Sequence, residues 1–251
     1  MKVRLSAYAA YQLRDFFLGR VPLLVLAASL ATWAVFRATG VTVAAFDPEA
    51  GIGGREQAQA AFENALGVYA MIAAVFAAQG LVARDRWRGF DRILFSRPLV
   101  PAQYYLQAFV LAGAAIVALG VVAAGVFTVA VRPVSVPGVA AFIALAWLTV
   151  GTLALALSTL TAYHLPVLLA LLSGAALLSQ FADRLRASGT ASPIIDAAQY
   201  LLPPVASIAA LREPLAQGRL VAPEDLAWPL AFGFVCTVAA VLLLHRRPFR
   251  S

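Results

Sequence analysis

Charged residues are scarce in this sequence. Only 12% of its 251 residues are Asp, Glu, Lys or Arg, whereas 62% are hydrophobic, and the mean hydropathy is +0.85. A water-soluble domain of this length carries about twice that share of charge. The composition therefore excludes a soluble globular fold and predicts a chain that lies in a membrane.

Lysine, cysteine and histidine are nearly missing. Lys2 is the only lysine, and a Walker-type ATP site needs a lysine beside its glycine-rich loop, so this chain cannot form one. Cys236 is the only cysteine, which excludes a disulfide within the chain. The two histidines, His164 and His245, fall at predicted span ends, where turn or headgroup contacts are far more common than ligation. We therefore expect no catalytic residues, no metal site and no cofactor here.

Long apolar runs dominate what is present. A membrane-spanning helix needs about 20 mostly apolar residues, and six such runs stand between charged or turn-forming segments. We predict an all-α, polytopic membrane protein that forms one domain over 1–251, with a tight reversal near 161–166 inside its longest apolar stretch. The predicted spans are 21–36, 62–82, 104–131, 138–163, 164–181 and 227–244.

Arginine supplies all the basic residues except Lys2, and its placement predicts the orientation. Loops on the cytoplasmic side of a membrane carry an excess of Lys and Arg. The dense basic clusters lie within 2–20, 84–97 and 246–250. They predict a multi-pass protein of the cell's inner (plasma) membrane with both termini in the cytoplasm. Topology explains these residues better than nucleic-acid binding does.

Three segments outside the spans have a predicted form. Residues 1–20 have an apolar and a charged side, which is typical of an interfacial elbow helix, although a frayed start to the first span is an alternative. Residues 39–61 are predicted to form an external loop. Prolines break residues 182–226 into short semi-apolar stretches, so we expect short outer helices there. They either lie on the surface or re-enter the membrane.

The cytoplasmic segment 84–103 is the most informative part of the sequence. Its large apolar residues fall at helical spacings of three and four, and its arginines fall on another side. A surface helix of this composition suits a docking site for a protein partner, while a positive-inside loop with aromatics in the headgroup region is an equal alternative. The residues are Trp87, Phe90 and Leu94 on the apolar side and Arg88 and Arg92 on the other.

The same segment carries a family pattern: an acidic residue, three variable positions, a glycine, and a stretch that ends in proline. Asp85, Gly89 and Pro98 occupy these positions. In this it resembles the first cytoplasmic loop of ABC-type exporter permeases of the second type. The elbow, the six spans and the long outer segment with its Leu201-Leu202-Pro203 element extend the resemblance over nearly the whole chain.

Two single positions and one pair of residues depart from the family pattern. Arg92 stands where an acidic residue is frequent and Phe90 stands where Thr is frequent. Gln107-Ala108 lies near the place of a Gly-Lys pair.

The resemblance implies a function and partners. In that family the loop helix docks on a separate subunit that binds ATP and Mg, and two permease copies, identical or related, form the exporter with two such subunits. The chain itself would then not be an enzyme. The docking residues implied here are Asp85, Trp87, Arg88, Gly89, Phe90, Arg92, Leu94, Arg97 and Pro98. Lipids, drugs, peptides and hydrophobic metabolites all suit an apolar path.

Few polar residues stand where they could line such a path. Arg37, Glu63 and Gln79 are the candidates, although a polar residue near a span end is more often interfacial. Because the spans hold almost no acidic residues, an ion-coupled carrier is disfavoured. A membrane scaffold or assembly subunit without transport activity is the alternative function.

The predicted orientation can be tested by cysteine labelling in a Cys236→Ser background. We expect Arg88→Cys to react with a membrane-impermeant maleimide only after the membrane is opened, because the arginine-rich segment lies inside. Arg219→Cys should react in intact cells. Labelling of Arg88→Cys in intact cells would contradict the orientation.

Overall fold

All regular structure in the described part of this computed structural model is helical. The described residues are 5–22, 25–26, 29, 37, 52–78, 81–82, 85, 100–187 and 192–246. Five helical stretches among them are long and apolar enough to cross a membrane, which confirms the predicted all-α membrane fold. The elements are α1 (Leu5–Asp15), η1 (Phe16–Arg20), α3 (Ile52–Ala78), α6 (Pro101–Ala130), α7 (Val136–Ala146), η3 (Trp147–Gly151), α8 (Thr152–Leu160), α9 (His164–Ala187), α10 (Ser192–Leu201), α11 (Val205–Ala216) and α12 (Pro223–Arg246).

Five of the six predicted spans correspond to these helices. In order, they match α3, α6, the continuous α7–η3–α8, α9 and α12. The tight reversal is confirmed at 161–163, where the backbone N–H of Tyr163 donates to Oγ1 of Thr161 at 3.1 Å. The first predicted span, 21–36, lies largely outside the described residues. The count of six spans therefore stays a prediction.

The predicted external loop 39–61 is wrong over its last ten residues, because α3 begins at Ile52. The glycines and polar residues of this segment are typical of a loop. Ala58 and Ala61, however, are 0% and 1% exposed, and the packing of this alanine side of α3 favours a helix. At 1.5 Å per residue, α3 is about 40 Å long. A helix of that length exceeds the roughly 30 Å hydrocarbon layer, so polar first turns can extend beyond it.

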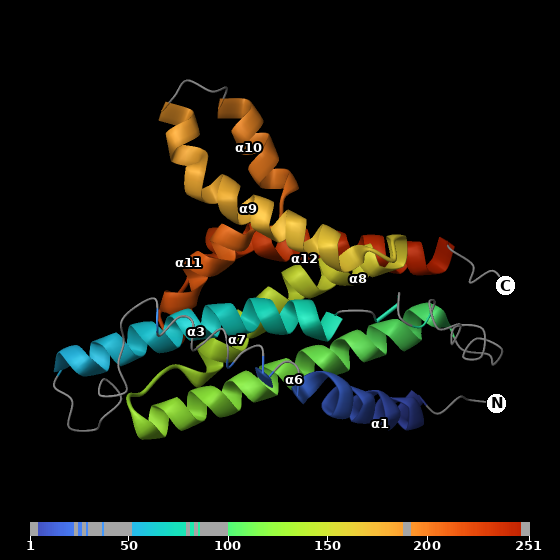
Figure 1. Ribbon diagram of the computed structural model, residues 1–251, viewed down its shortest axis with the longest axis horizontal. Coiled ribbons are helices and arrows are strands. Elements are labelled where there is room, and N and C mark those ends of the chain that lie inside the picture. The colour runs from blue at the N-terminus through green and yellow to red at the C-terminus, as the bar shows by residue number, and fades with distance from the viewer. Residues whose placement is uncertain are drawn as a thin grey trace.

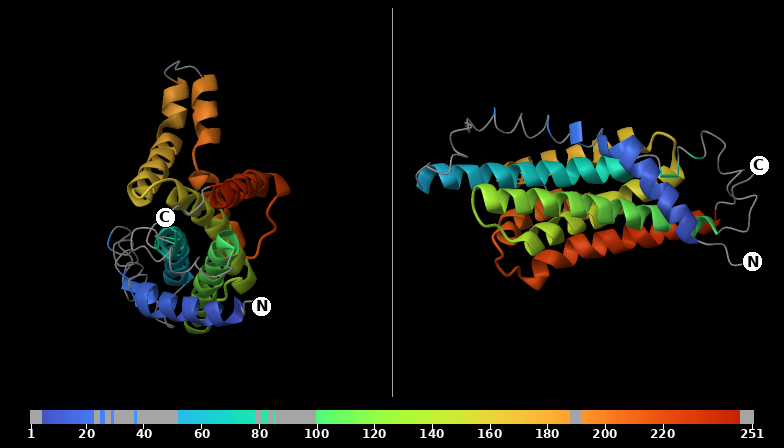
Figure 2. Two further views of the ribbon diagram at one scale, coloured as in Figure 1. Left: turned by 90° about the vertical axis from the view of Figure 1, so that its right-hand side faces the viewer. Right: turned by 90° about the horizontal axis from the view of Figure 1, so that it is seen from below.

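The spans run alternately up and down along one long axis (Figures 1 and 2). α1 and the end of α12 lie at one end of this bundle, together with the end of α3 and the start of α6. We call it the terminal end. The start of α3, the 131–135 connection and the 217–222 connection lie at the other end, which we call the distal end. α1 crosses the other helices rather than running parallel to them (Figure 2).

The α7–η3–α8 span is the centre of the bundle. Within its most apolar window 72% of residues are buried, compared with 17% in α9 and 22% in α12. η3 is a π-helical turn, and Trp147 at its start stacks on Phe109 of α6 with ring centroids 4.4 Å apart. α7 packs on α6 and α11, whereas α8 packs on α12 and α9. The two halves of one span therefore have different neighbours.

Small residues on α6 allow this close packing. A Cβ added at Gly113 would lie 2.3 Å from Nε1 of Trp147, and Ala124 is 0% exposed. At Gly120 the added Cβ would lie 2.0 Å from Cδ1 of Ile143. Gly125 on the same helix differs, because no atom of the described residues lies within 4 Å of a Cβ built there.

The segment 182–226 contains the short helices that the sequence predicts. α10 pairs with the second half of α9 in a hairpin that projects from the bundle (Figure 1). α11 instead packs against α7, α3, α9 and α12, and its Ile208 and Leu211 are buried. α11 is therefore part of the helical bundle.

The glycine contacts predict a difference between two equivalent substitutions on α6. Gly113→Ala should lower thermal stability in detergent by about 1–3 kcal/mol, because the Trp147 ring is held by Phe109 and cannot retreat. Gly125→Ala should be neutral or slightly stabilising, because its methyl group meets nothing and alanine favours helix. Equal melting temperatures of the two variants would contradict this packing.

Candidate functional site

The segment predicted to dock a partner joins the end of α3 to the start of α6, and both of these helix ends lie at the terminal end (Figure 1). Asp85 is helical and partly buried. The predicted pathway residue Gln79 lies outside the described residues. So do the other predicted docking residues, which are Trp87, Arg88, Gly89, Phe90, Arg92, Leu94, Arg97 and Pro98.

The start of α6 is fixed against α1. Val100 is extended and Pro101 occupies the first turn of α6, where a missing N–H costs nothing. Tyr104 makes an edge-to-face contact with Tyr8, with centroids 6.2 Å apart, and its carbonyl oxygen accepts a hydrogen bond from Nε2 of Gln12 at 3.3 Å. A movement at the start of α6 would therefore also move α1.

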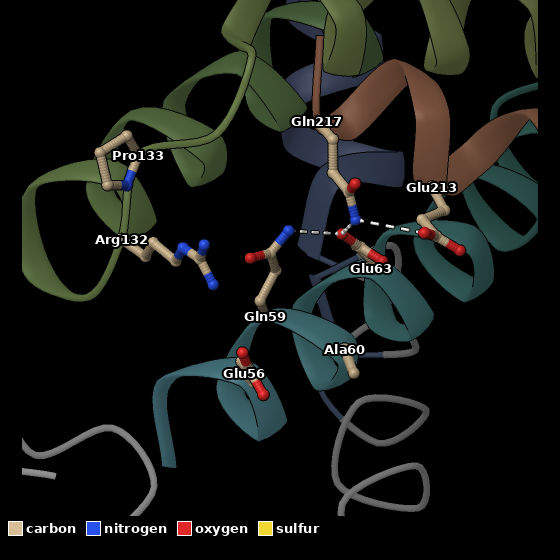
Figure 3. Close-up of a pocket in the computed structure, with 8 residues that line it drawn as sticks. All are labelled: Glu56, Gln59, Ala60, Glu63, Arg132, Pro133, Glu213 and Gln217. Atoms are coloured by element: carbon tan, nitrogen blue, oxygen red, sulfur yellow. Dashed lines mark hydrogen bonds between the residues drawn. The ribbon is translucent and has the colours of Figure 1, made fainter. Parts of the chain in front are cut away.

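A polar pocket of about 530 Å³ opens at the distal end, between α3, the connection after α6, and α11 (Figure 3). Among the described residues that line it, only Pro133 and Ala60 lack a polar side chain. Arg132 stands on one wall, and the carboxylates and amides of α3 and α11 form the other (Figure 3). The lining residues are Glu56, Gln59, Ala60, Glu63, Arg132, Pro133, Glu213 and Gln217. We call it the distal pocket.

Glu63 is the buried polar centre of the distal pocket. It is 7% exposed, and its Oε1 accepts hydrogen bonds from Nε2 of Gln59 at 2.9 Å and from Nε2 of Gln217 at 3.1 Å. Gln217 also reaches Oε1 of Glu213 at 3.4 Å. One amide therefore links two carboxylates, one from α3 and one from α11 (Figure 3).

The charges around the distal pocket are mostly negative. Among the described lining residues, three are carboxylates, Glu56, Glu63 and Glu213, and one is a guanidinium, that of Arg132. Arg219 approaches Glu213 with Nη2 3.7 Å from Oε1, but both side chains are more than half exposed, so this pair is weak. The described lining of the pocket therefore offers a ligand more negative than positive side chains.

The structure describes two of the three predicted pathway residues, Glu63 and Arg37. Glu63 lies in the distal pocket. Arg37 is helical and exposed and is not among the pocket's lining residues. Gln79 lies outside the described residues, as stated above.

Several hydroxyl groups in the described spans donate to the backbone of their own helix. The hydroxyl of Thr149 donates to the carbonyl of Leu145 at 2.8 Å, and that of Ser158 donates to Leu155 at 2.8 Å. His164 begins α9 and its Nδ1 lies 3.2 Å from the carbonyl oxygen of Ala162. Where the structure describes the chain, no three His, Cys, Asp or Glu side chains gather closely enough to hold a metal ion.

Comparisons with models of known protein families, with curated proteins and with solved structures found no match to this chain. The function therefore has to be argued from the residues and their arrangement.

Sequence reasoning found Glu63 but missed the rest of the distal pocket. The sequence predicts a loop at Gln59 and Glu56, and in a loop their spacing from Glu63 does not predict that the three side chains lie on one side of a helix. A usable signal existed in two pairs spaced by four residues, Gln59 with Glu63 and Glu213 with Gln217, because such pairs share one side of a helix. Their meeting across 154 residues has no local signal.

The hydrogen bond between Gln217 and Glu63 should couple α11 to α3. We expect a double-mutant cycle of Gln217→Ala and Glu63→Ala, followed by thermal unfolding in detergent, to give a coupling energy of about 1 kcal/mol. A cycle of Gln217→Ala with Glu224→Ala should give none, because Glu224 does not line the pocket. Additive effects in the first cycle would show that this contact does not stabilise the fold.

Proposed function

We propose that this chain is the transmembrane permease subunit of an ATP-binding-cassette exporter, driven by a separate ATPase subunit. The observation that carries the proposal is the Asp85, Gly89 and Pro98 pattern between the end of α3 and the start of α6, two helix ends that lie on the same side as α1. The ATPase subunit binds ATP and Mg, and this chain supplies the membrane path together with a second copy or a related chain.

The ends of the described helices support six crossings. α1 lies at the terminal end, whereas α3 begins with Ile52 at the distal end (Figure 1). The proposed span 21–36 is the apolar run available to connect them. With it, both termini share the cytoplasmic side, and α1 is the interfacial elbow helix.

In the proposed mechanism, closure of the ATPase subunits on ATP pushes on residues 87–98. Only contacts that differ between the ATP-bound and ATP-free states can move the permease, so the docking segment must be joined rigidly to its spans. α6 starts immediately after it and is about 45 Å long. Tyr104 connects the start of α6 to α1. Gly113 leaves room for the Trp147 ring to pack against the middle of α6. α6 therefore acts as a lever that carries α1 and the central span.

The lightly buried helices support a path formed between two copies. α9 keeps 17% of its apolar window buried, and the α9–α10 hairpin projects away from the bundle. Large apolar side chains such as Leu177, Phe181 and Leu201 are exposed along it. Lipid or a second copy would cover this surface in the membrane.

Copurification tests the docking step. We expect a Walker-type ATPase encoded beside this chain to copurify with it in detergent at a fixed ratio. Trp87→Asp and Phe90→Asp should each reduce the bound ATPase more than about tenfold, because a charge replaces an apolar anchor. Leu220→Asp is the matched control, since Leu220 is fully exposed in the connection between α11 and α12 at the distal end.

Two outcomes would contradict the proposal. If Trp87→Asp and Phe90→Asp retain the ATPase as well as Leu220→Asp does, the segment 84–103 is not the docking site. If the ATPase binds but ATP moves no candidate substrate across reconstituted vesicles, the chain acts as a scaffold or assembly subunit.

A further inference from the structure

The distal pocket presents a buried carboxylate for which the described residues provide no counter-ion. Within the described structure, no Lys, Arg or His nitrogen lies within 4.0 Å of the carboxylate of Glu63. Two neutral amides occupy Oε1, and Oε2 accepts no hydrogen bond from the described residues. An ionised carboxylate that is 7% exposed and has no cationic partner is costly.

The nearby arginines do not satisfy Glu63. Arg132 lines the opposite wall and is exposed, and Arg219 pairs with Glu213 at the rim. Arg212 lies one helical turn deeper against α3, where its Nη1 would be 3.1 Å from a Cβ at Gly67. Its Nε is buried and donates no hydrogen bond within the described residues. Oε2 of Glu63, a residue that lines the pocket, is therefore left without a hydrogen-bond donor or a counter-ion among the described residues.

Size and charge define what could fill the distal pocket. A volume of about 530 Å³ admits a small organic molecule, and three carboxylates against one guanidinium favour a positive charge. The acceptors do not converge into a metal-binding group in the described residues. The N–H donors of an ammonium group point in different directions, so carboxylates on separate helices can each accept one of them.

We propose that the distal pocket binds the ammonium group of an organic cation, with Glu63 as its counter-ion. Oε2 of Glu63 accepts one N–H, and the carboxylate of Glu213 accepts a second from the side of α11. Gln59 and Gln217 hold Glu63 in place through Oε1. This binding goes beyond the proposed transport function and belongs to this chain alone, so it does not need an ATPase partner.

Calorimetric titration of the full chain, purified in an uncharged detergent, tests this site. The probe is benzylammonium, and benzyl alcohol is its neutral control of similar shape. We expect benzylammonium to bind and benzyl alcohol not to. Glu63→Gln should raise the Kd for benzylammonium at least about tenfold, because it removes the charge and keeps the shape. Glu224→Gln, at an exposed carboxylate outside the pocket, should leave the Kd unchanged.

Two further variants test the location and the sign of the charge. Ala60→Trp should abolish binding by filling the pocket, while Glu63 stays charged. Arg132→Gln should lower the Kd, because it removes the one positive charge from the lining. Size-exclusion elution identical to the unsubstituted chain confirms that each variant is folded.

The proposal is overturned if Glu63→Gln and Glu224→Gln bind benzylammonium equally well. It is also overturned if the unsubstituted chain binds neither probe at millimolar concentration, or binds both equally. These results would leave the docking of the ATPase unaffected, and loss of ATPase docking would leave benzylammonium binding unaffected. The two proposals can therefore fail separately.

Discussion

The packing of Trp147 in the middle of the central span is the contact on which the rest of this bundle depends. Its ring stacks on Phe109 and fills the space that Gly113 and Gly151 leave open. In lipid, apolar surfaces gain little by leaving the solvent, so helices are held together by close van der Waals contact and by hydrogen bonds. Gly233 continues this arrangement, because a Cβ there would lie 2.8 Å from the carbonyl oxygen of Leu148. The central span is thus enclosed by α6 and α12 at positions where neither has a side chain.

The two ends of the bundle have different chemistry, and α3 and α6 connect them. The terminal end presents aromatic rings, since Tyr104 at the start of α6 contacts Tyr8 of α1 and its own neighbour Tyr105. The distal end presents carboxylates and amides that join α3 to α11. Tyr69 links the two helices between these ends, since its hydroxyl donates to the carbonyl of Ile116 at 2.8 Å. A displacement at one end of α6 therefore reaches α3 through a direct hydrogen bond.

Hydropathy predicted most of the fold because apolar length is a local property of the sequence. The five described spans and the reversal at 161–163 follow from it. It failed at 52–61, where glycines and charges suggest a loop but buried alanines hold a helix. It could not separate Gly113 from Gly125, because contact with Trp147 depends on a helix elsewhere in the chain. The distal pocket was missed for the same reason, since Glu63 and Gln217 meet only through the packing of α11.

The π turn η3 also determines which way each half of the central span faces. An α-helix advances 100° per residue, and a turn closed by bonds from i to i+5 contains one residue more than an α-helical turn. The faces of α7 and α8 are therefore offset by about 100° from those of an unbroken α-helix. This offset lets α7 meet α6 and α11 while α8 meets α12 and α9. The number of residues in that turn, whatever their chemical nature, thus determines which helices α8 contacts. A chain one residue shorter there would turn a different side of α8 toward α12.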